Sequence, residues 1–489
     1  MIMKYNNPII KGFYPDPSVC RAGERFYLVC STFQYMPGVP VFESEDLINW
    51  NQIGNALTRP SQVDLASVPS SGGVFAPTIR YHKGRFYMVT TNDTLHKNFY
   101  VYTDDITGEW SEPIFVDQGG IDPSLLFDNG KVYFTSNGGD DFGDHGVTQC
   151  EIDIETGRKL TPSKTIWHGT GGRYLESPHL YKIGSYYYLT AAEGGTEYGH
   201  MIVCARSKNP MGPFENCPNN PVLTNRNKGG FEIQGAGHGD LIQSASGEWF
   251  IIHLAFRQIG QYEMYHHLGR EVYMVPVHFD DDGWFTCGND GTTEFEYDID
   301  AASPQAPIHD YTLSNIDRKL MLLYLRDYKP DNYILDDSCY TLKGDETTID
   351  MPGSPTFIGI RQQAMNGSLS CKISVLGKGE AGITIYMDEN HHYDLLIRKE
   401  HDACFAVLML NIGNIKHKEK IVPLKNDSAM MSVQFTSHEY NFYVNDEFMG
   451  TGLTRYLSSE VAGGFTGVLF GMYAQGDITA NYTDYLLKQ

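Results

Sequence analysis

The chain has 489 residues, 41% of them hydrophobic, and this length predicts two or more globular domains rather than a single core. Its 60 acidic side chains outnumber the 37 basic ones, so the formal net charge is −23. This charge disfavours binding to nucleic acid or to an anionic membrane, and it leaves neutral or cationic ligands as the expected partners.

The nine cysteines are scattered along the chain without a C-x-x-C pair, which predicts buried reduced thiols rather than a disulfide framework. The first residues, MIMKYNNPIIKGF, lack an apolar core of signal-peptide length. No stretch approaches the ~18 consecutive apolar residues that a membrane-spanning helix needs. We therefore expect a cytoplasmic protein, with the removal of an export signal as the alternative.

The first notable element is GFYPDPSVC, in which Asp16 stands between two prolines, shortly before the strand-like run FYLVC at 26–30. The prolines disfavour a helix and stiffen the approach to the strand, so the direction of Asp16 is restricted. On this stretch alone the simpler interpretation is a turn, because Asp-Pro commonly forms one.

The first three hundred residues contain a repeat of five units. Each unit has a short strand, a turn at Gly, an aromatic-rich strand such as GRFYMVTTN or GSYYYLTAAEG, and then one or two further strands. This order is typical of a four-stranded propeller blade, and aromatic residues, 13% of the chain, favour strands. The units begin near residues 16, 76, 122, 176 and 237. We predict an all-β protein whose residues 1–297 form a five-bladed β-propeller.

The composition changes after the last unit. All five tryptophans precede residue 290, and the polar stretch DIDAASPQAPIHDYTLS at 298–314 predicts a linker. Its apolar residues Ile308, Tyr311 and Leu313 suggest packing along the propeller. From 315 to 489, alternating segments such as GITIYMDENHHYDLLIRKE predict an antiparallel β-sandwich. The pairs His266-His267 and His391-His392 are expected to be exposed.

Three of the five units begin with an acid, namely Asp16, Asp122 and Glu176. Because the innermost strands of a propeller surround one central channel, these acids are expected to converge at its mouth, at one phase of the repeat. Neighbouring carboxylates raise one another's pKa, so the set can contain both an acid and a base at neutral pH. Such a set suits hydrolysis of a glycosidic bond in a neutral sugar.

The sequence resembles glycoside hydrolase family 43, most closely its β-xylosidase branch with a C-terminal β-sandwich. The resemblance covers essentially the whole chain and rests on the motifs NNPIIKGFYPDPSVC, SGGVFAPTIRYH, GGIDPSLLFD, YLESPHLYK, GAGHGDL and LGREV. It implies that Asp16 is the general base, Asp122 the modulator of proton affinity and Glu176 the general acid. It also implies inversion of the anomeric configuration.

The resemblance extends to residues around the acids. Arg270 is expected to hold sugar hydroxyls, with simple pairing to Glu271 or Asp122 as the alternative. Phe33 is expected to flank the first sugar, with a core role as the alternative, and Phe75 stands where close relatives usually carry Trp. A sandwich loop with Phe465 is expected to close the pocket, which implies exo action.

His238 in GAGHG faces the same channel, and related proteins differ in whether calcium is held there through waters. Because calcium prefers oxygen ligands, a lone histidine is a poor site. No cofactor is expected to be required, and calcium in the channel stays an alternative. Expected partners are xylo-oligosaccharides and further copies of the chain, as a dimer or tetramer.

The predicted function is release of D-xylose from the non-reducing end of β-1,4-xylo-oligosaccharides. An α-L-arabinofuranosidase, or an enzyme with both activities, is the alternative within hydrolases. Two further classes stay open: a non-catalytic carbohydrate-binding propeller, which gains nothing from converging acids, and a phosphorolytic enzyme, which would need a basic cluster for phosphate.

Overall fold

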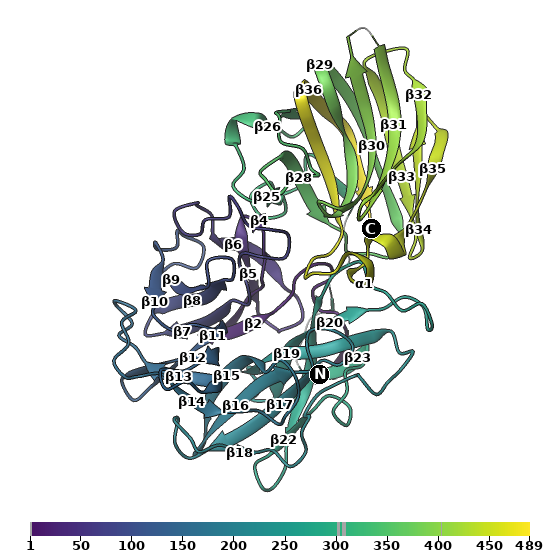
Figure 1. Ribbon diagram of the computed structural model, residues 1–489. Helices are drawn as coiled ribbons and strands as arrows, with labels where there is room; N and C mark the ends of the chain where they lie inside the picture. The colour runs from purple at the N-terminus through teal and green to yellow at the C-terminus, as the bar shows by residue number, and fades with distance from the viewer. Residues whose placement is uncertain (1, 301–303, 306–309, 402) are drawn as a thin grey trace.

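A computed structural model describes residues 2–300, 304–305, 310–401 and 403–489. Two β-rich bodies lie one above the other, the propeller formed by the first part of the chain and the sandwich by the last part (Figure 1). The predicted fold class, a five-bladed β-propeller followed by a β-sandwich, is confirmed.

Each blade is a sheet of four antiparallel strands whose neighbours in space are nearly all neighbours in sequence. Blade one has β2 (Ser18–Ala22), β3 (Arg25–Val29), β5 (Gly38–Ser44) and β6 (Asn51–Leu57). Blade two has β7 (Thr78–His82), β8 (Arg85–Asn92), β9 (Lys97–Thr103) and β10 (Ile114–Val116). Blade three has β11 (Ile121–Asp128), β12 (Lys131–Gly139), β13 (His145–Glu151) and β14 (Lys164–Trp167). Blade four has β15 (Glu176–Ile183), β16 (Tyr186–Glu193), β17 (Met201–Ser207) and β18 (Glu215–Asn216). Blade five has β19 (Ile233–Gln243), β20 (Trp249–Arg257), β21 (Glu271–Phe279) and β22 (Phe285–Cys287).

The first turn of each blade follows from its sequence. Gly23 joins β2 to β3 with a φ of 64°, a backbone conformation that glycine adopts without a steric penalty. The strand that follows, RFYLV, is buried after its first residue, because the two faces of a blade pack against neighbouring blades. The aromatic-rich runs form the second strand of each blade, next to the innermost one, as the order of the repeat predicts.

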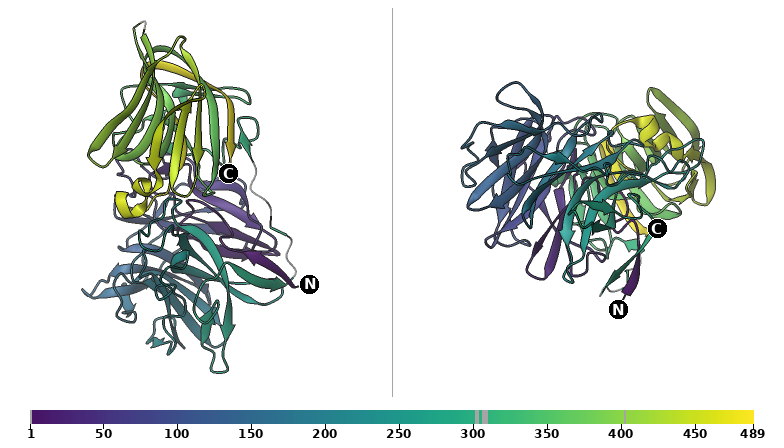
Figure 2. Two further views of the ribbon diagram at one scale, coloured as in Figure 1. Left: turned by 90° about the vertical axis from the view of Figure 1, so that its right-hand side faces the viewer. Right: turned by 90° about the horizontal axis from the view of Figure 1, so that it is seen from below.

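The amino-terminal strand joins the end of the propeller. β1 (Ile2–Asn6) pairs with β23 (Glu296–Asp300), and Ile10 forms a bridge with Val272 of β21 (Figure 2). Strand β23 crosses the predicted propeller boundary at 297. The middle of the predicted linker, 301–303 and 306–309, and with it Ile308, lies outside the described residues.

The end of the linker belongs to the sandwich, whereas Gln305 bonds to the backbone of Asn6 in the propeller. β24 (Tyr311–Thr312) pairs with β36 (Leu469–Lys488), and Leu313 lies in the sandwich core. Tyr311 packs half-buried against the same core. The expectation of packing along the propeller was wrong for Leu313, because the domain that follows it buries its side chain. β25 (Tyr324–Leu325) instead bridges the domains by pairing with β4 (Tyr35–Met36) of the propeller.

The sandwich is built around two long strands, β29 (Gly367–Asp388) and β36. The first part of β29 pairs with β33 and the second part with β30, so this strand contributes to both sheets. The change occurs near Gly377, where φ is 101° and a Cβ atom would lie 2.3 Å from the carbonyl oxygen of Asp477. The close approach of the two backbones therefore requires glycine here.

Shorter elements complete the sandwich. They are η1 (Pro330–Asn332), β26 (Tyr333–Leu335), β27 (Tyr340–Lys343), β28 (Thr356–Arg361), β30 (His391–Glu400), β31 (Ala403–Ile412), β32 (Ile415–Pro423), β33 (Ser428–Phe435), β34 (Glu439–Val444), β35 (Glu447–Leu453), η2 (Thr454–Leu457) and α1 (Ser459–Ala462). All nine cysteines have free thiols, and eight are buried, as predicted. No helix in the described part of the chain is long and apolar enough to cross a membrane.

The expectation of exposed histidine pairs was wrong, since all four of these side chains are at least nine-tenths buried. His392 is the more deeply buried histidine of the sandwich pair, and both of its ring nitrogens face carboxylates. Nδ1 lies 2.8 Å from Asp394 Oδ2, and Nε2 lies 3.0 Å from Asp350 Oδ1. Burial opposes the charged form, but these two carboxylates raise the pKa of His392 to about 9.

We predict that His392→Gln destabilises the sandwich more at pH 6 than at pH 10. A folded-state pKa above the unfolded value stabilises the protein fully below about pH 6.5, and this stabilisation is lost as the pH rises through about 9. The expected loss at pH 6 is about 3 kcal/mol, from a shift of this size. Urea unfolding at both pH values measures it. His391→Gln, which removes one contact to Asp388, is the matched control, and an equal loss at both pH values would contradict the charged assignment.

Candidate active site

Four of the five blades have a shared backbone feature in or just before the inner strand. Asp16, Asp122, Ser177 and His238 all have φ between 50° and 54°, in the left-handed region. β-Bulges interrupt the pairing of β11, β15 and β19 at these places. Such positions re-aim side chains and are frequent near active sites. Ser177, and not Glu176, holds the equivalent position in blade four, so the third acid lies one residue earlier than the expected phase.

A cavity of about 60 Å³ lies at this mouth of the channel. All eight residues predicted for the site line it, together with four that the sequence did not indicate. The predicted residues are Asp16, Phe33, Phe75, Asp122, Glu176, His238, Arg270 and Phe465, and the additional ones are Ala76, Ile121, Thr196 and His200. The three acids thus meet in one small pocket although the blades that carry them are far apart in sequence.

Asp16 is buried and has partners for both of its carboxylate oxygens. Ser31 Oγ donates to Oδ2 at 2.6 Å, and Arg270 Nη1 donates to Oδ1 at 2.8 Å. Burial on its own would raise the pKa of Asp16, but the positive charge of Arg270, the adjacent His238 and the Ser31 hydrogen bond together lower it below its ordinary value. Asp16 is therefore a carboxylate at neutral pH.

The pKa values of the other two acids, Glu176 and Asp122, are shifted upward instead. Burial, and then the charge of Asp16, raise the pKa of Glu176 to about 7, although Arg270 opposes the shift. Burial, together with the charges of Glu176 and Asp16, raises the pKa of Asp122 well above its ordinary value, and one hydrogen bond from Ser177 N at 2.9 Å only partly offsets this. The pocket therefore holds one charged carboxylate beside a pair that retains protons near neutral pH.

Arg270 connects Asp16 to the outer wall of the pocket. Its Nη1 also donates to Thr196 Oγ1 at 2.9 Å, and Nη2 is buried without a partner among the described residues. The alternative pairing with Glu271 or Asp122 was wrong, because Glu271 is bound by Arg257 and Arg270 pairs with Asp16. The unpartnered Nη2 is available to a ligand hydroxyl.

Three phenylalanines form an apolar wall. Phe465 stacks on Phe33 at 5.7 Å between ring centroids and meets Phe75 edge to face at 6.0 Å. Phe33 is 2% exposed and packs in the core between the domains, which is the alternative considered for it, and it also lines the pocket. Phe465 comes from the sandwich, and its backbone N–H donates to Ser71 Oγ of the propeller at 2.8 Å. The sandwich therefore completes the pocket.

Two histidines lie on the far side of Asp16. His238 Nδ1 is 3.7 Å from Asp16 Oδ1, and burial lowers the pKa of His238. His200 Nδ1 donates to the carbonyl oxygen of Gly235 at 3.1 Å, and burial lowers its pKa to about 3, so this ring is neutral. Thr196 and His200 were missed because they are the two ends of the segment TEYGH, which has no repeat signal of its own.

The donor atoms present do not suit direct coordination of calcium. Asp16 is already engaged by Arg270 and Ser31, and the histidines offer nitrogen, whereas calcium prefers six to eight oxygens. Among the described residues, no group of three or more His, Cys, Asp or Glu side chains could hold a metal ion. Arg270 supplies the positive charge next to Asp16.

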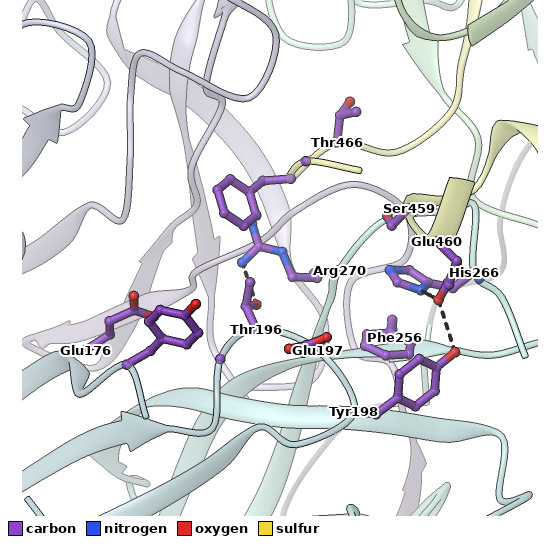
Figure 3. Close-up of a pocket in the computed structure, with 14 residues that line it drawn as sticks. Glu176, Thr196, Glu197, Tyr198, Phe256, His266, Arg270, Ser459, Glu460 and Thr466 are labelled. Carbon is purple, nitrogen blue, oxygen red and sulfur yellow. Dashed lines mark hydrogen bonds and ion pairs between the residues drawn. The ribbon is translucent and has the colours of Figure 1, made fainter. Parts of the chain in front are cut away.

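A second cavity of about 470 Å³ continues from the first (Figure 3). The two share Glu176, Thr196, Arg270 and Phe465, so they meet at these four residues. The larger cavity extends between blade four of the propeller and α1 of the sandwich. The arrangement is a small inner pocket and a wider outer one, with a protonated acid between them.

Comparison with known proteins agrees with this arrangement. Residues 5–285 match the model of glycosyl hydrolases family 43, and residues 319–485 match the β-xylosidase C-terminal concanavalin A-like domain. A non-reducing end α-L-arabinofuranosidase of Bacteroides ovatus is 38% identical over 98% of this chain and 92% of its own. A xylosidase/arabinosidase of Butyrivibrio fibrisolvens is 36% identical over 98% of each chain.

A solved structure titled Bacteroides ovatus Xyloglucan PUL GH43B aligns with a TM-score of 0.93 and 36% identity, covering 99% of this chain and 100% of that one. The match therefore includes both domains and the interface at which Phe465 meets the propeller. On the strength of these matches, the chain belongs to glycosyl hydrolases family 43.

Proposed function

We propose that the protein is an exo-acting glycoside hydrolase that removes one terminal pentosyl residue by inversion, with D-xylose from β-1,4-xylo-oligosaccharides as the first candidate. The observation that carries the proposal is the inner pocket of about 60 Å³ behind Phe465, in which three carboxyl groups meet, one with a lowered pKa and two with raised pKa values. A pocket so small and closed by an aromatic side chain favours a single sugar at a chain end.

In the proposed reaction Asp16 is the general base. It accepts a proton from a water molecule whose oxygen attacks the anomeric carbon. Glu176, protonated up to about pH 7, donates its proton to the glycosidic oxygen as that bond breaks. The electron pair of the broken bond stays on the leaving oxygen. Asp122 adjusts the proton affinity of Glu176, and the free Nη2 of Arg270 holds a sugar hydroxyl.

A terminal α-L-arabinofuranosyl residue is the second candidate. It is favoured by the Bacteroides ovatus relative, which is named as an arabinofuranosidase and aligns along nearly the whole chain. The name of the Butyrivibrio relative includes both activities. Family membership favours a hydrolase over the non-catalytic propeller, while the phosphorolytic alternative lacks a cluster of basic side chains in the inner pocket as described.

The experiment that tests the proposal compares nitrophenyl β-D-xylopyranoside, nitrophenyl α-L-arabinofuranoside and xylobiose, with and without phosphate. We expect hydrolysis of at least one aryl pentoside, no dependence on phosphate, and a first product with inverted anomeric configuration by NMR. Internal cleavage of a long xylan would refute exo action. Retention of configuration would refute inversion, and inactivity on both pentosides would refute removal of a terminal pentosyl residue.

Asp122→Asn is predicted to move the basic limb of the pH–rate profile. The charge of Glu176 is one of the causes that raise the pKa of Asp122, so the two carboxyls titrate as an interacting pair, and an amide in place of one alters the proton affinity of the other. The limb is expected near pH 7 in the unaltered protein. Profiles of kcat/KM measure the shift. Asp117→Asn, an exposed acid just before the same strand, is the control, and an unmoved limb in Asp122→Asn would argue against the modulating role.

Removal of divalent metal is predicted to leave the activity unchanged. Arg270 already provides the positive charge next to Asp16, and the side chains around His238 are poor ligands for calcium. Dialysis against EDTA followed by assays with and without added calcium checks this. Activity that disappears on chelation and returns only with calcium would establish a metal in the channel.

A further inference from the structure

The outer cavity lies on the side of Glu176 that the leaving group must occupy. In the proposed reaction Glu176 protonates the glycosidic oxygen, so the atoms beyond that oxygen extend away from the inner pocket. The cavity that begins there measures about 470 Å³, against about 60 Å³ for the inner pocket. This volume lies within the range of ~300–1,000 Å³ that holds drug-sized ligands, which corresponds to a leaving group of more than one sugar ring.

The walls of the outer cavity come from both domains. Tyr174, Tyr198 and Phe256 of the propeller provide aromatic faces, and Phe465 provides another from the sandwich. Tyr174 is 60% exposed, which is unusual for a large aromatic side chain and places a flat face at the rim. Aromatic faces of this kind suit the C–H faces of neutral sugars.

The outer wall is fixed by one acid of the sandwich, Glu460 of α1. Its Oε1 accepts a hydrogen bond from Tyr198 OH at 3.0 Å and lies 2.8 Å from His266 Nδ1, while its Oε2 accepts from the backbone N–H of His266 at 2.9 Å. Ser459 N–H donates to the carbonyl oxygen of His266 at 3.1 Å. These contacts, several of them drawn in Figure 3, fasten α1 to the propeller.

His266 is in turn held by the propeller. Its ring stacks on Phe256 with centroids 3.8 Å apart and an angle of 11° between the planes. Two glycines, Gly463 and Gly464, follow α1 with φ of 75° each and lead directly to Phe465. The position of α1 therefore affects the outer cavity, whereas the loop that closes the inner pocket is held separately by Ser71 Oγ, which accepts from the Phe465 backbone N–H.

We propose that Glu460, held by Tyr198 and His266 across the domain interface, is a positioning residue that shapes the leaving-group cavity and makes the enzyme select substrates whose leaving group is a neutral sugar chain of about two residues. This inference rests on the proposed function, because it assigns the outer cavity from the role of Glu176. Glu460 does not line the inner pocket, so it acts on the leaving group and not on the terminal sugar.

Charge supports the choice of a neutral chain. Besides the protonated Glu176, the outer cavity is lined by Glu460 and by Glu197, which pairs with Arg173, whereas Arg270 is its one arginine or lysine among the described lining residues and is paired with Asp16. A leaving group carrying a carboxylate would meet these acids in a partly dehydrated space. Like charges in such a space repel, so an acidic branch next to the scissile bond is disfavoured.

The test compares two substrates with the same terminal pentose, a nitrophenyl glycoside with a single-ring leaving group and a trisaccharide with a disaccharide leaving group. For Glu460→Ala we expect KM for the trisaccharide to rise about ten-fold, because charge-assisted hydrogen bonds that hold the wall are lost. The aryl glycoside should change by less than about two-fold in kcat/KM. Tyr198→Phe, which removes a single hydroxyl, should raise the trisaccharide KM by about three-fold.

Glu447→Gln, an exposed acid paired with Lys420 elsewhere in the sandwich, is the matched control and should leave both substrates unchanged. Equal losses on the two substrates, or no loss in either Glu460→Ala or Tyr198→Phe, would overturn the proposal. Glu460→Gln is the second variant if Glu460→Ala does not fold, since its amide oxygen can still accept from Tyr198.

Binding separates this inference from the proposed reaction. Calorimetric titration of the trisaccharide into Glu176→Gln, with and without Glu460→Ala, needs no turnover and should show about ten-fold weaker binding in the double variant. If the unaltered protein hydrolyses neither aryl pentoside, the proposed function fails, whatever the binding result. Identical affinities in the single and double variants would instead refute the role of Glu460 alone.

Discussion

Glu176→Gln is expected to lower kcat on xylobiose by about 10³-fold, because a general acid typically contributes 10²- to 10⁴-fold and the amide has no proton to give to a poor leaving group. A nitrophenyl glycoside should lose far less, about ten-fold, since nitrophenolate leaves without full protonation. The basic limb near pH 7, assigned to Glu176, should disappear from the profile with the activated substrate. Steady-state kinetics on both substrates measures these effects.

The controls for this variant use the same blade. Glu215→Gln changes an exposed acid on β18, whose side chain is 71% exposed, and should leave both rates unaltered. Burial of a neutral amide in place of an acid that is already protonated should also leave the melting temperature near its original value. If xylobiose and the aryl glycoside lost the same factor, Glu176 would not be the acid.

Asp16→Asn is expected to abolish turnover of both substrates, with a loss of about 10⁴-fold or more in kcat. Activation of water is required whatever group leaves, and an amide cannot accept the proton. The exchange also removes the negative partner of Arg270, whose Nη1 lies 2.8 Å from Asp16 Oδ1. The pKa of Glu176 should therefore fall, because the charge of Asp16 is one of the causes that raise it.

Two measurements distinguish loss of the base from loss of structure. Thermal unfolding reports the fold, and binding of the product pentose reports the inner pocket without chemistry. Asp240→Asn is not a suitable control, since Asp240 is buried and joins Arg80, Ser18 and Tyr181 inside the channel. Exposed Asp117 is suitable. Near-normal turnover in Asp16→Asn would refute the assignment of Asp16 as base.

Much of the architecture is readable from the sequence because strand and turn preferences are local. Glycine at a turn such as Gly23, followed by an aromatic run, specifies a hairpin whatever surrounds it, and five such units in order specify the blades. The Asp-Pro-Ser motif that contains Asp16, and again Asp122, is also a short stretch of sequence, so these two acids could be identified without the structure. The linker was harder to interpret, since an apolar residue such as Leu313 indicates burial but not which domain buries it.

Most residues of the site could be predicted from the sequence, but the ion pairs between them could not. The motifs identified eight of the twelve residues that line the inner pocket, yet they gave no indication that Arg270 pairs with Asp16 while Glu271 binds Arg257. Pairing of Arg270 with either Asp16 or Glu271 is compatible with the sequence. The pairing depends on which carboxylate the folded backbone brings close to the guanidinium, and in the structure this is Asp16, whose Oδ1 lies 2.8 Å from Arg270 Nη1.

The sequence by itself determined the class of fold, the order of the blades, the sandwich and the identity of the three acids, since these follow from short-range patterns in the chain. Only the tertiary structure decided the proton affinities of Asp16 and Glu176, the burial of His392 and the contact of Glu460 with His266. The physical reason is that solvation and Coulomb interactions depend on distances between residues far apart in sequence. Such distances exist only once the blades and the sandwich have packed together.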